Sequence, residues 1–352
     1  MKRWYLIAAL LLVSVLVAGS IGCASQQPPA PQQREKVDVV ILGATAGGGA
    51  YIASVGLAEL INKYHPWLRA TAMETFGSVD NVKKIENDPK SFGVMSDITY
   101  WTALEGVKPF EKKYTNMRTV GVNYVGAYAL LSMNPKIKTK QDLVGKKIGM
   151  NTKGSSISQC AEFLLGDVWG MMDKINPQYV AWKEGAQAMK DGLLDAELVV
   201  IGLSADADGN VIWTDHPSFA ELIALKDVYI IGPTQEEVAA AMKKKGWPAV
   251  YMSMPAKALG PRQPEATGVI SILNAFMGDA SMPNDVAYEI TKMQYDHYKE
   301  WGNYVSHVKF ITPKTLGFAP VSSEDGFHPG TLKFLKEKGV KLYIAGNAPP
   351  MK

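Results

Sequence analysis

Short apolar runs alternate with longer amphipathic segments along most of the chain. The first run, residues 37–42, has the length and the β-branched content of a buried strand. Apolar side chains then recur at Tyr51, Val55, Ala58 and Ile61, on one face of a helix that begins near Ala50. Later runs predict strands over residues 69–74, 92–95, 147–150 and 197–201, and helices from Ile157 and over residues 283–301 and 331–338. This alternation predicts an α/β fold.

A glycine-rich loop, residues 43–49, joins the first strand to the first helix, and residues 151–156 repeat the arrangement after a later strand. A strand, glycine loop and helix present backbone N–H groups and the positive end of a helix to an anion. Two nucleotide-binding patterns fail. In the dinucleotide pattern GxGxxG the third glycine would fall at Ile52, and in the Walker pattern Lys140 stands where the first glycine is required. A tight turn without a ligand is the alternative for either loop.

Three successive strands of the first half end in small or hydroxyl-bearing residues. The glycine loop follows the first, residues 75–78 follow the second, and Ser96 with Asp97 follow the third. In an open parallel sheet such loops converge, and ligands bind in the crevice between them. We also expect Thr75 or Ser78 to cap the next helix. Ordinary helix caps explain each loop singly, but they account less well for all three.

Two long apolar segments, residues 117–133 and 267–276, are predicted to be strands that cross between two bodies. The chain is therefore expected to form two α/β lobes joined by two crossover strands. The first lobe would comprise residues 37–124 plus 272–352, and the second residues 125–271. The glycine loops would face each other and close on a small ligand. Two further helix starts are predicted by capping pairs, Thr139 with Asp142 and Thr234 with Glu237.

The N-terminal residues predict export. Residues 1–23 combine Lys2 and Arg3 with an apolar stretch and end at Cys23, which is typical of a lipoprotein-type signal peptide. We expect an extracytoplasmic, periplasmic protein, lipid-anchored at Cys23, with simple signal cleavage as the alternative. Residues 24–36 are rich in Gln and Pro and predict a tether. Cys160 would then be the only remaining cysteine, packed and inert, which excludes an internal disulfide.

Composition leaves room for a large core. The 352 residues are 47% hydrophobic and 20% charged, enough apolar material for two domains of ordinary size. The formal net charge is +3 and the lysines are scattered, so nucleic acid is not the expected partner.

Six segments in order resemble one protein family: GGGAYIASVGLAELINKY, ETFGSVDNVKKI, FGVMSDITYWTALEG, KTKQDLVGKKIGMNTKGSS, MPNDVAYEITK and FHPGTLKFLKEKGV. They are similar to the TAXI family of solute-binding proteins, the extracytoplasmic proteins associated with TRAP transporters, over residues 37–342. The resemblance implies a bilobed type II periplasmic-binding-protein fold that delivers a small solute to the membrane subunits of a TRAP permease. Known solutes of the family are mainly small carboxylates such as glutamate and 2-oxoglutarate.

This chain departs from the family in the loops expected to touch the ligand. Gly47 and Ile157 stand where threonine is common, and Lys153 stands near the place of a proline. Phe76 replaces a glycine and is expected to narrow the pocket of the first lobe. The ligand is therefore expected to be bulkier, more apolar, or bound by Lys153.

A carboxylate or amino acid ligand would be held by helix-terminal N–H groups near Gly48, Gly49 and Ser155 and by hydroxyl groups of the loops. Tyr51, Tyr100, Trp101 and Tyr128 are candidates for an apolar wall, with plain core as the alternative. The full set of candidate ligand-binding residues is Thr45, Gly48, Gly49, Tyr51, Thr75, Gly77, Ser78, Ser96, Asp97, Lys153, Gly154, Ser155, Ser156 and Ser204.

An enzyme or a ligand-sensing domain on the same fold, without a transport role, is the competing hypothesis. The sequence shows no Ser/His/Asp motif and no paired carboxylates at a glycine loop, so no catalytic residue, cofactor or metal is expected. The segment from Ser204 to Asp215 has the spacing of a calcium loop, but an inserted β-turn explains it better. His328 is expected to form a structural turn before the last helix.

Overall fold

The computed structural model describes residues 34–205, 211–215, 217–245 and 249–344. The predicted signal peptide with Cys23 and most of the predicted tether lie outside these residues. Val37–Lys352 forms one compact unit. Its strands are β1 Val37–Leu42, β2 Leu68–Met73, β3 Ser91–Ser96, β4 Met117–Ser132, β5 Lys147–Gly149, β6 Asn176–Gln178, β7 Ala196–Ala205, β8 Val211–Thr214, β9 Tyr229–Ile231, β10 Tyr251–Met254 and β11 Thr267–Asp279.

Helices flank these strands. They are α2 Gly49–Tyr64, α3 Ser78–Ile85, α4 Asp97–Glu105, α5 Ser156–Glu162, α6 Trp182–Lys190, α7 Pro217–Leu225, α8 Gln235–Lys245, α9 Asn284–Trp301 and α10 Pro329–Glu337. Three 3-10 helices, Lys140–Leu143, Ser306–Phe310 and Glu324–Gly326, and a π-helix, Phe163–Val168, complete the described elements. The predicted strands and helices are confirmed, most of them with shifts of one or two residues. β7 and β11 run four and three residues further than predicted.

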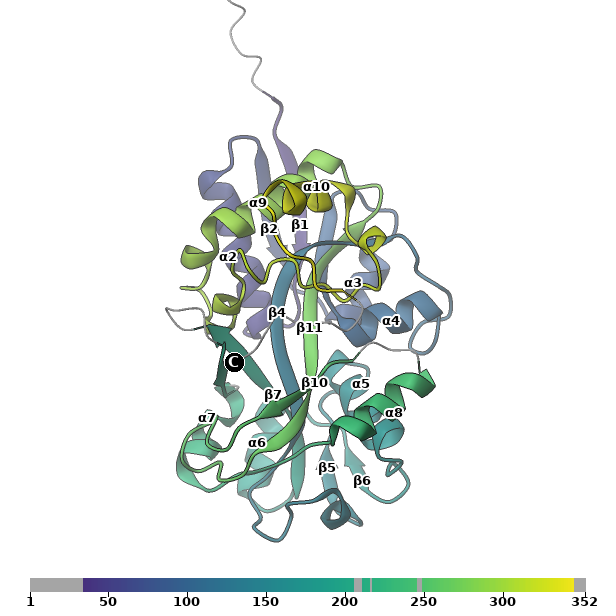
Figure 1. Ribbon diagram of the computed structural model, residues 1–352, viewed down its shortest axis with the longest axis vertical. Helices are drawn as coiled ribbons and strands as arrows, with labels where there is room; N and C mark the ends of the chain where they lie inside the picture. The colour runs from purple at the N-terminus through teal and green to yellow at the C-terminus, as the bar shows by residue number, and fades with distance from the viewer. Residues whose placement is uncertain (1–33, 206–210, 216, 246–248, 345–352) are drawn as a thin grey trace, which may run out of the picture. The chain divides into compact units, whose positions relative to one another are not determined.

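The strands form two parallel groups joined through β4 and β11. The sheet order is β2-β1-β3-β11-β4-β7-β5-β6, with β8, β9 and β10 paired to β7, β4 and β11. β1 is parallel to β2 and β3, and β5 is parallel to β6 and β7. β11 is antiparallel to β3 and β4, and β4 to β7. Helices α2, α3, α9 and α10 pack around the first group and α5 to α8 around the second, which gives two α/β lobes (Figure 1).

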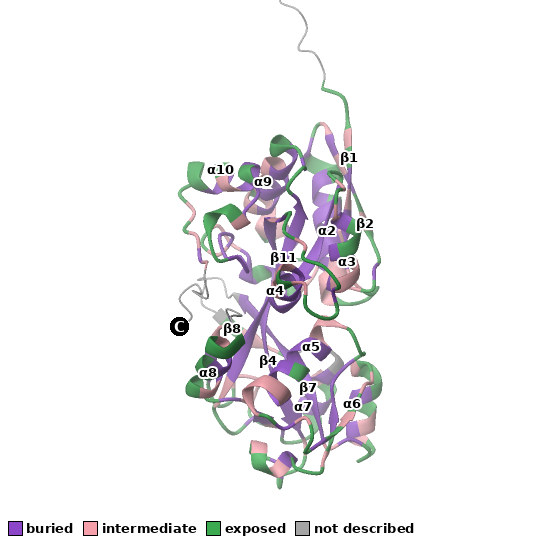
Figure 2. Cartoon of the chain, turned by 90° about the vertical axis from the view of Figure 1, so that its right-hand side faces the viewer, coloured by how far each residue is buried: buried purple, intermediate pink, exposed green. Residues whose placement is uncertain are grey.

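β4 and β11 confirm the two predicted crossover strands. They pair from Ile270 opposite Tyr128 to Asp279 opposite Met117, with two register shifts along the way. Both strands are buried along nearly their whole length (Figure 2). Their apolar character is explained by this double burial, since side chains on both faces of a central strand lack contact with water.

Local capping follows the sequence in two places. Thr139 and Asp142 form a reciprocal capping box at the 3-10 helix Lys140–Leu143. Thr234 and Glu237 bond each other's backbone N–H groups at the start of α8. β7 and β8 pair as an antiparallel hairpin, as the preferred interpretation of residues 204–215 required. Asp206, Asp208 and Gly209 of the calcium-loop alternative lie outside the described residues.

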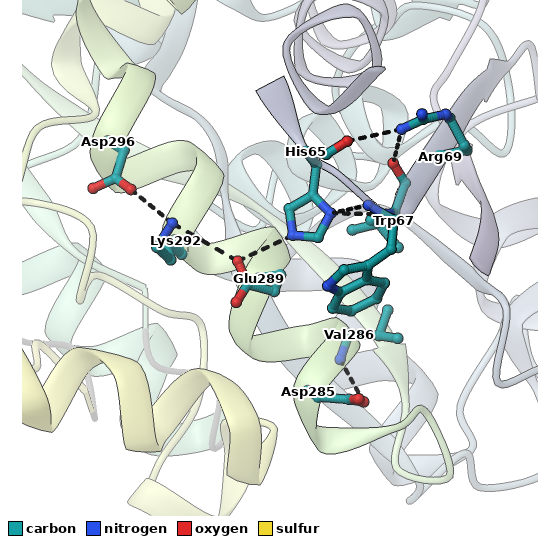
Figure 3. Close-up of polar contacts among 9 residues, drawn as sticks. His65, Trp67, Arg69, Asp285, Val286, Glu289, Lys292 and Asp296 are labelled. Atoms are coloured by element: carbon teal, nitrogen blue, oxygen red, sulfur yellow. Dashed lines mark hydrogen bonds and ion pairs between the residues drawn. The ribbon is translucent and has the colours of Figure 1, made fainter. Parts of the chain in front are cut away.

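The turn between α2 and β2 is attached to α9 by a polar cluster. Nε2 of His65 lies 3.2 Å from Oε2 of Glu289, and Nδ1 of His65 accepts the N–H of Leu68 at 2.7 Å. Arg69 donates to the carbonyl oxygen of His65 at 2.8 Å, and Lys292 extends the cluster along α9 (Figure 3). Because the His65 side chain is buried, these contacts fix the C-terminal end of α2 against the core of the first lobe.

Candidate ligand-binding site at the helix N-termini

Both glycine loops contain the same four-residue turn. In residues 45–48 the N–H of Gly48 donates to the carbonyl oxygen of Thr45 at 3.1 Å, and in residues 152–155 the N–H of Ser155 donates to that of Thr152 at 3.0 Å. The third residue of each turn is a glycine with positive φ, +80° at Gly47 and +82° at Gly154. A type II turn requires this conformation at its third position, and glycine adopts it without steric cost. Each turn leads directly into a helix.

The two helices differ in how their first N–H groups are satisfied. The hydroxyl of Ser155 accepts the N–H of Ser158 at 3.1 Å and caps α5. Gly48 occupies the same position before α2 and has no side chain to offer, so α2 starts without a side-chain cap. The opening N–H groups of a helix have no partner within the helix and carry its positive end charge. The glycine loop of the first lobe is therefore the better anion site of the two.

The three strand ends of the first lobe converge as predicted. The buried Asn81 amide donates to the carbonyl oxygens of Gly43 at 2.8 Å and Val94 at 2.8 Å, and so joins the ends of β1 and β3. The hydroxyl of Thr75 donates to the carbonyl oxygen of Gly43 at 3.1 Å. These bonds hold the loops in one arrangement, because buried carbonyl groups are left unsatisfied if the side chains are removed.

The expected cap of α3 is wrong. Its cap position is Gly77, with φ of +101° and no side-chain bond to the helix. Thr75 turns back to accept the N–H of Gly77 at 3.2 Å, and the hydroxyl of Ser78 accepts the N–H of Ser96 at 3.2 Å. Both hydroxyls hold neighbouring loops instead of capping a helix, so α3, like α2, begins without a side-chain cap.

One acidic side chain, Glu74, bonds to the glycine loop that precedes α2. Oε1 of Glu74 accepts the N–H of Ala46, inside the glycine loop, at 2.8 Å. A carboxylate at this place demonstrates that the loop presents an N–H group suited to an anion. Phe76 is 93% exposed, so the expectation that it narrows a pocket is wrong. It projects from the loop between β2 and α3.

The N-terminus of α2 lies against two aromatic side chains that the sequence did not indicate. A Cβ atom at Gly49 would lie 2.4 Å from Cε1 of His307, so only glycine allows the imidazole to approach this closely. The ring of Tyr124, on β4, meets the His307 ring edge to face at 4.6 Å between centroids. Burial raises the pKa of the Tyr124 hydroxyl, which keeps it neutral. His307 and Tyr124 are therefore additional candidates for contact with a ligand.

A hydrogen bond joins the two lobes beside the site. The hydroxyl of Thr99, on α4, donates to Oε1 of Gln159, on α5, at 2.9 Å, and both side chains are buried. Ser96 caps α4 by accepting the N–H of Thr99 at 3.4 Å. Its neighbour Asp97 accepts the N–H groups of Ile98 and Leu273, at 2.7 and 3.2 Å. Burial raises the pKa of Asp97 to about 7, although these two bonds favour the ionised form.

The remaining candidate ligand-binding residues differ in how far they are exposed to solvent. Thr45, Gly48, Lys153 and Gly154 are exposed, while Gly49, Tyr51, Gly77, Ser155 and Ser156 are partly exposed. The ammonium group of Lys153 lies over the ring of Tyr179, 5.3 Å from its centroid. Ser204 is buried and donates to the carbonyl oxygen of Ser306 at 3.0 Å, which fastens β7 to a 3-10 helix.

The four proposed aromatic wall residues have different positions. Tyr128 is fully buried and belongs to the core, and Tyr100 is also buried. Trp101 is partly exposed. The ring of Tyr51 packs near Gly43, where an added Cβ would lie 2.8 Å from its Cδ2 atom. The Tyr51 ring therefore packs against the first residue of the glycine loop.

Cys160 and His328 have structural surroundings in the described part of the chain. No group of three or more His, Cys, Asp or Glu residues there is placed to hold a metal ion. Cys160 is buried, and burial raises the pKa of its thiol. His328 caps α10 by accepting the N–H of Gly330 at 3.3 Å, which confirms its structural role. Within the same residues, no helix is both long and apolar enough to cross a membrane.

The strand order and the two joined lobes define a bilobed α/β protein. The profile of the NMT1-like family matches residues 41–339, and the chain belongs to this family.

Three solved structures are similar at low identity. The periplasmic aliphatic sulphonate binding protein SsuA from Escherichia coli is 14% identical, with a TM-score of 0.45 over 86% of this chain and 84% of SsuA. The periplasmic binding protein BugD is 11% identical, with a TM-score of 0.48 over 88% and 99%. MatC from Rhodopseudomonas palustris, with bound malate, is 10% identical, with a TM-score of 0.47 over 86% and 96%. TM-scores below 0.5 carry no argument, so the family assignment rests on the profile match alone.

Proposed function

We propose that this chain is an extracytoplasmic solute-binding protein that delivers a small, carboxylate-bearing organic solute to a TRAP permease. It would be a TAXI-type member of its family, act by binding and not by catalysis, and work in the periplasm on a lipid anchor at Cys23. The lobes would comprise residues 37–124 plus 272–352 and residues 125–271, and close around the solute.

The observation that carries this proposal is the uncapped start of α2 behind the turn that contains Gly47. Gly48 leaves the first N–H groups of α2 without a side-chain cap, and the turn is exposed. Glu74 already places a carboxylate on the N–H of Ala46 in the same loop. Carboxylates bind favourably at helix N-termini because the N–H groups and the helix dipole both attract negative charge.

The uncapped start of α3 supports the same ligand chemistry from the neighbouring strand. Asn81 bonds the ends of β1 and β3 together, so the loops stand as one group. The matching turn at Gly154, with Lys153 beside it, would supply the second lobe's contribution. An amino acid fits this setting as well as a simple carboxylate, because Glu74 can accept a hydrogen bond from an ammonium group.

Closure is supported by the bond between Thr99 and Gln159. It joins helices from the two lobes, and it can form only while α4 and α5 lie close together. A solute held between the lobes would favour the arrangement in which this bond exists.

The proposal is tested with the purified exported protein and libraries of carboxylates, amino acids and aromatic acids. A true solute should raise the melting temperature, since it binds only the folded state, and isothermal titration should show one site. Mass spectrometry of the protein as isolated should find the same compound. Absence of any shift across all three libraries would overturn the proposal, as would turnover of a bound compound.

A further inference from the structure

A cavity of about 310 Å³ lies beside the α4–α5 junction, and no residue of either glycine loop lines it. This volume falls at the lower end of the roughly 300–1,000 Å³ that is usual for small-molecule sites, which suits a small ligand. Its lining residues are Ile98, Trp101, Thr102, Val107, Lys108, Gln159, Glu162, Phe163, Asp167 and Lys245.

Both lobes contribute to the lining. α4, which follows β3, supplies Ile98, Trp101 and Thr102. The other wall comes from α5, from the π-helix that continues it, and from the end of α8. A ligand in this cavity would therefore touch elements of both lobes at once.

The apolar part of the wall is largely aromatic. Trp101 is partly exposed, while Phe163 and Ile98 are buried on the two sides of the junction. Aromatic and aliphatic walls with a few polar groups are the usual composition of a small-molecule site. A planar ring can stack on Trp101 with the favourable geometry of aromatic pairs.

Of the two lysines that line the cavity, Lys245 is engaged in an ion pair and Lys108 can bind an anionic ligand. Lys245 pairs with Asp167 at 2.9 Å, and Glu162 accepts the hydroxyl of Tyr179 at 3.2 Å. Lys108 makes no ion pair with any described residue. Nε2 of Gln159 has no hydrogen-bond partner within the described part of the chain, while its Oε1 is held by Thr99. A buried amide without a partner is costly, and an oxygen ligand would relieve that cost.

We propose that this cavity is a second binding site, for a small aromatic carboxylate. The ring lies against Trp101 and Phe163. The carboxylate accepts hydrogen bonds from Lys108 and from the unpartnered Nε2 of Gln159, whose Oε1 stays bonded to Thr99. The site shares no residue with the glycine loops, and the proposal does not require its ligand to be the transported solute. Since its walls come from both lobes, a ligand here stabilises the arrangement in which Thr99 bonds to Gln159.

Isothermal titration of the exported protein with phenylacetate tests the site. We expect one equivalent to bind and 2-phenylethanol, which keeps the ring but lacks the carboxylate, to bind more weakly. Lys108→Gln should weaken phenylacetate binding roughly tenfold, because it removes a charge-assisted bond. Lys90→Gln, at another exposed lysine, is the matched control and should change nothing.

Val107→Trp places a large side chain at the cavity and should abolish phenylacetate binding. Lys108 is exposed, so the Lys108→Gln variant should fold normally. It therefore still tests the site if Val107→Trp fails to fold. The proposal is overturned if phenylacetate fails to bind, or if Lys108→Gln and Lys90→Gln bind it equally. It is also overturned if Gly48→Ser, in the glycine loop, weakens phenylacetate binding while Val107→Trp does not. The first two outcomes leave solute binding at the glycine loops untouched, whereas the third would place phenylacetate at the glycine loop of the first lobe.

Discussion

Gly47 and Gly154 occupy the same position in two matching turns, one in each lobe, with φ of +80° and +82°. Each turn ends at the residue that precedes a helix, Gly48 before α2 and Ser155 before α5. The two turns thus share one backbone conformation, but only α5 has a side-chain cap. Glu74 places its carboxylate on the turn that precedes the uncapped helix, α2. The turn and the cap can therefore be varied separately, and the effect of each on solute binding can be measured.

Gly47→Ala should weaken solute binding. No atom lies within 4 Å of the added Cβ, so the change acts only through the backbone, where alanine at positive φ costs about 1–2 kcal/mol. Gly145→Ala is the matched control, because Gly145 has φ of +73°, equally open surroundings and a position before β5. Chemical denaturation should show similar destabilisation in both variants, but only Gly47→Ala should lose affinity by titration. Equal affinities in the two would contradict the role of the loop.

Gly48→Ser should stabilise the protein and weaken solute binding together. Serine at this position can cap α2 as Ser155 caps α5, and such a cap contributes roughly a few tenths of a kcal/mol relative to glycine. The same cap uses an N–H group that the solute would need. Thermal unfolding and titration of the variant measure the two effects. A stabilised variant that binds its solute unchanged would show that the start of α2 is not the anion site.

Glu74→Gln should strengthen the binding of an anionic solute. Glu74 holds a negative charge on the N–H of Ala46, and its removal relieves repulsion worth up to about 1 kcal/mol at an exposed position. Asp38→Asn removes the same charge at the opposite end of β1 and serves as the control. Titration at low ionic strength should give a higher affinity for Glu74→Gln alone. An amino acid solute whose ammonium group contacts Glu74 would instead lose affinity.

Thr99→Val should loosen the junction between the lobes. The change keeps the shape of the side chain, removes the bonds to Gln159 and to the Ser96 hydroxyl, and leaves the buried amide oxygen of Gln159 unpaired, at a cost of about 1–3 kcal/mol. Thr102→Val, one turn further along α4, removes only a bond to the carbonyl oxygen of Thr99. Thermal unfolding should therefore show a larger loss for Thr99→Val. The reverse order would mean that the bond between the lobes does not contribute to stability.

Glu197→Gln should change how stability depends on pH. Glu197 is fully buried on β7, neither carboxylate oxygen has a partner within the described residues, and burial raises its pKa to about 9. The folded state therefore retains a proton that the unfolded state releases above about pH 4.5, so stability falls as pH rises from about 4.5 to 9. At pH 7 the loss is about 3 kcal/mol relative to acidic pH.

The glutamine variant should lack this loss and be more stable than the original chain at pH 7, with the difference shrinking towards pH 4.5. Glu184→Gln, at an exposed neighbour on α6, is the control and should leave the profile nearly unchanged. Urea unfolding at a series of pH values measures the effect. Parallel profiles for the original chain and Glu197→Gln would contradict the assignment.

Local patterns in the sequence predicted most elements because they depend on near neighbours. Val39 and Ile41 alternate with outward residues in β1, and the capping pair of Thr139 and Asp142 lies within four residues. The glycine loops were predicted for the same reason, since the turn at Gly47 is closed by residues three apart. The cap of α3 was mispredicted because Thr75 has a competing acceptor, the carbonyl oxygen of Gly43, far away in the chain.

The sequence by itself determined the α/β alternation, the two long crossover strands and the two glycine turns, because each follows from periodicity or from backbone conformations that only certain residues adopt. Only the tertiary structure decided which helix N-terminus stays uncapped beside a carboxylate, which loops Asn81 binds together, and that Thr99 meets Gln159. Those contacts join residues widely separated along the chain, and the position of a distant hydrogen-bond partner is not encoded in any local pattern. The cavity beside α4 and α5 has the same origin, since its walls come from segments that meet only when the lobes fold together.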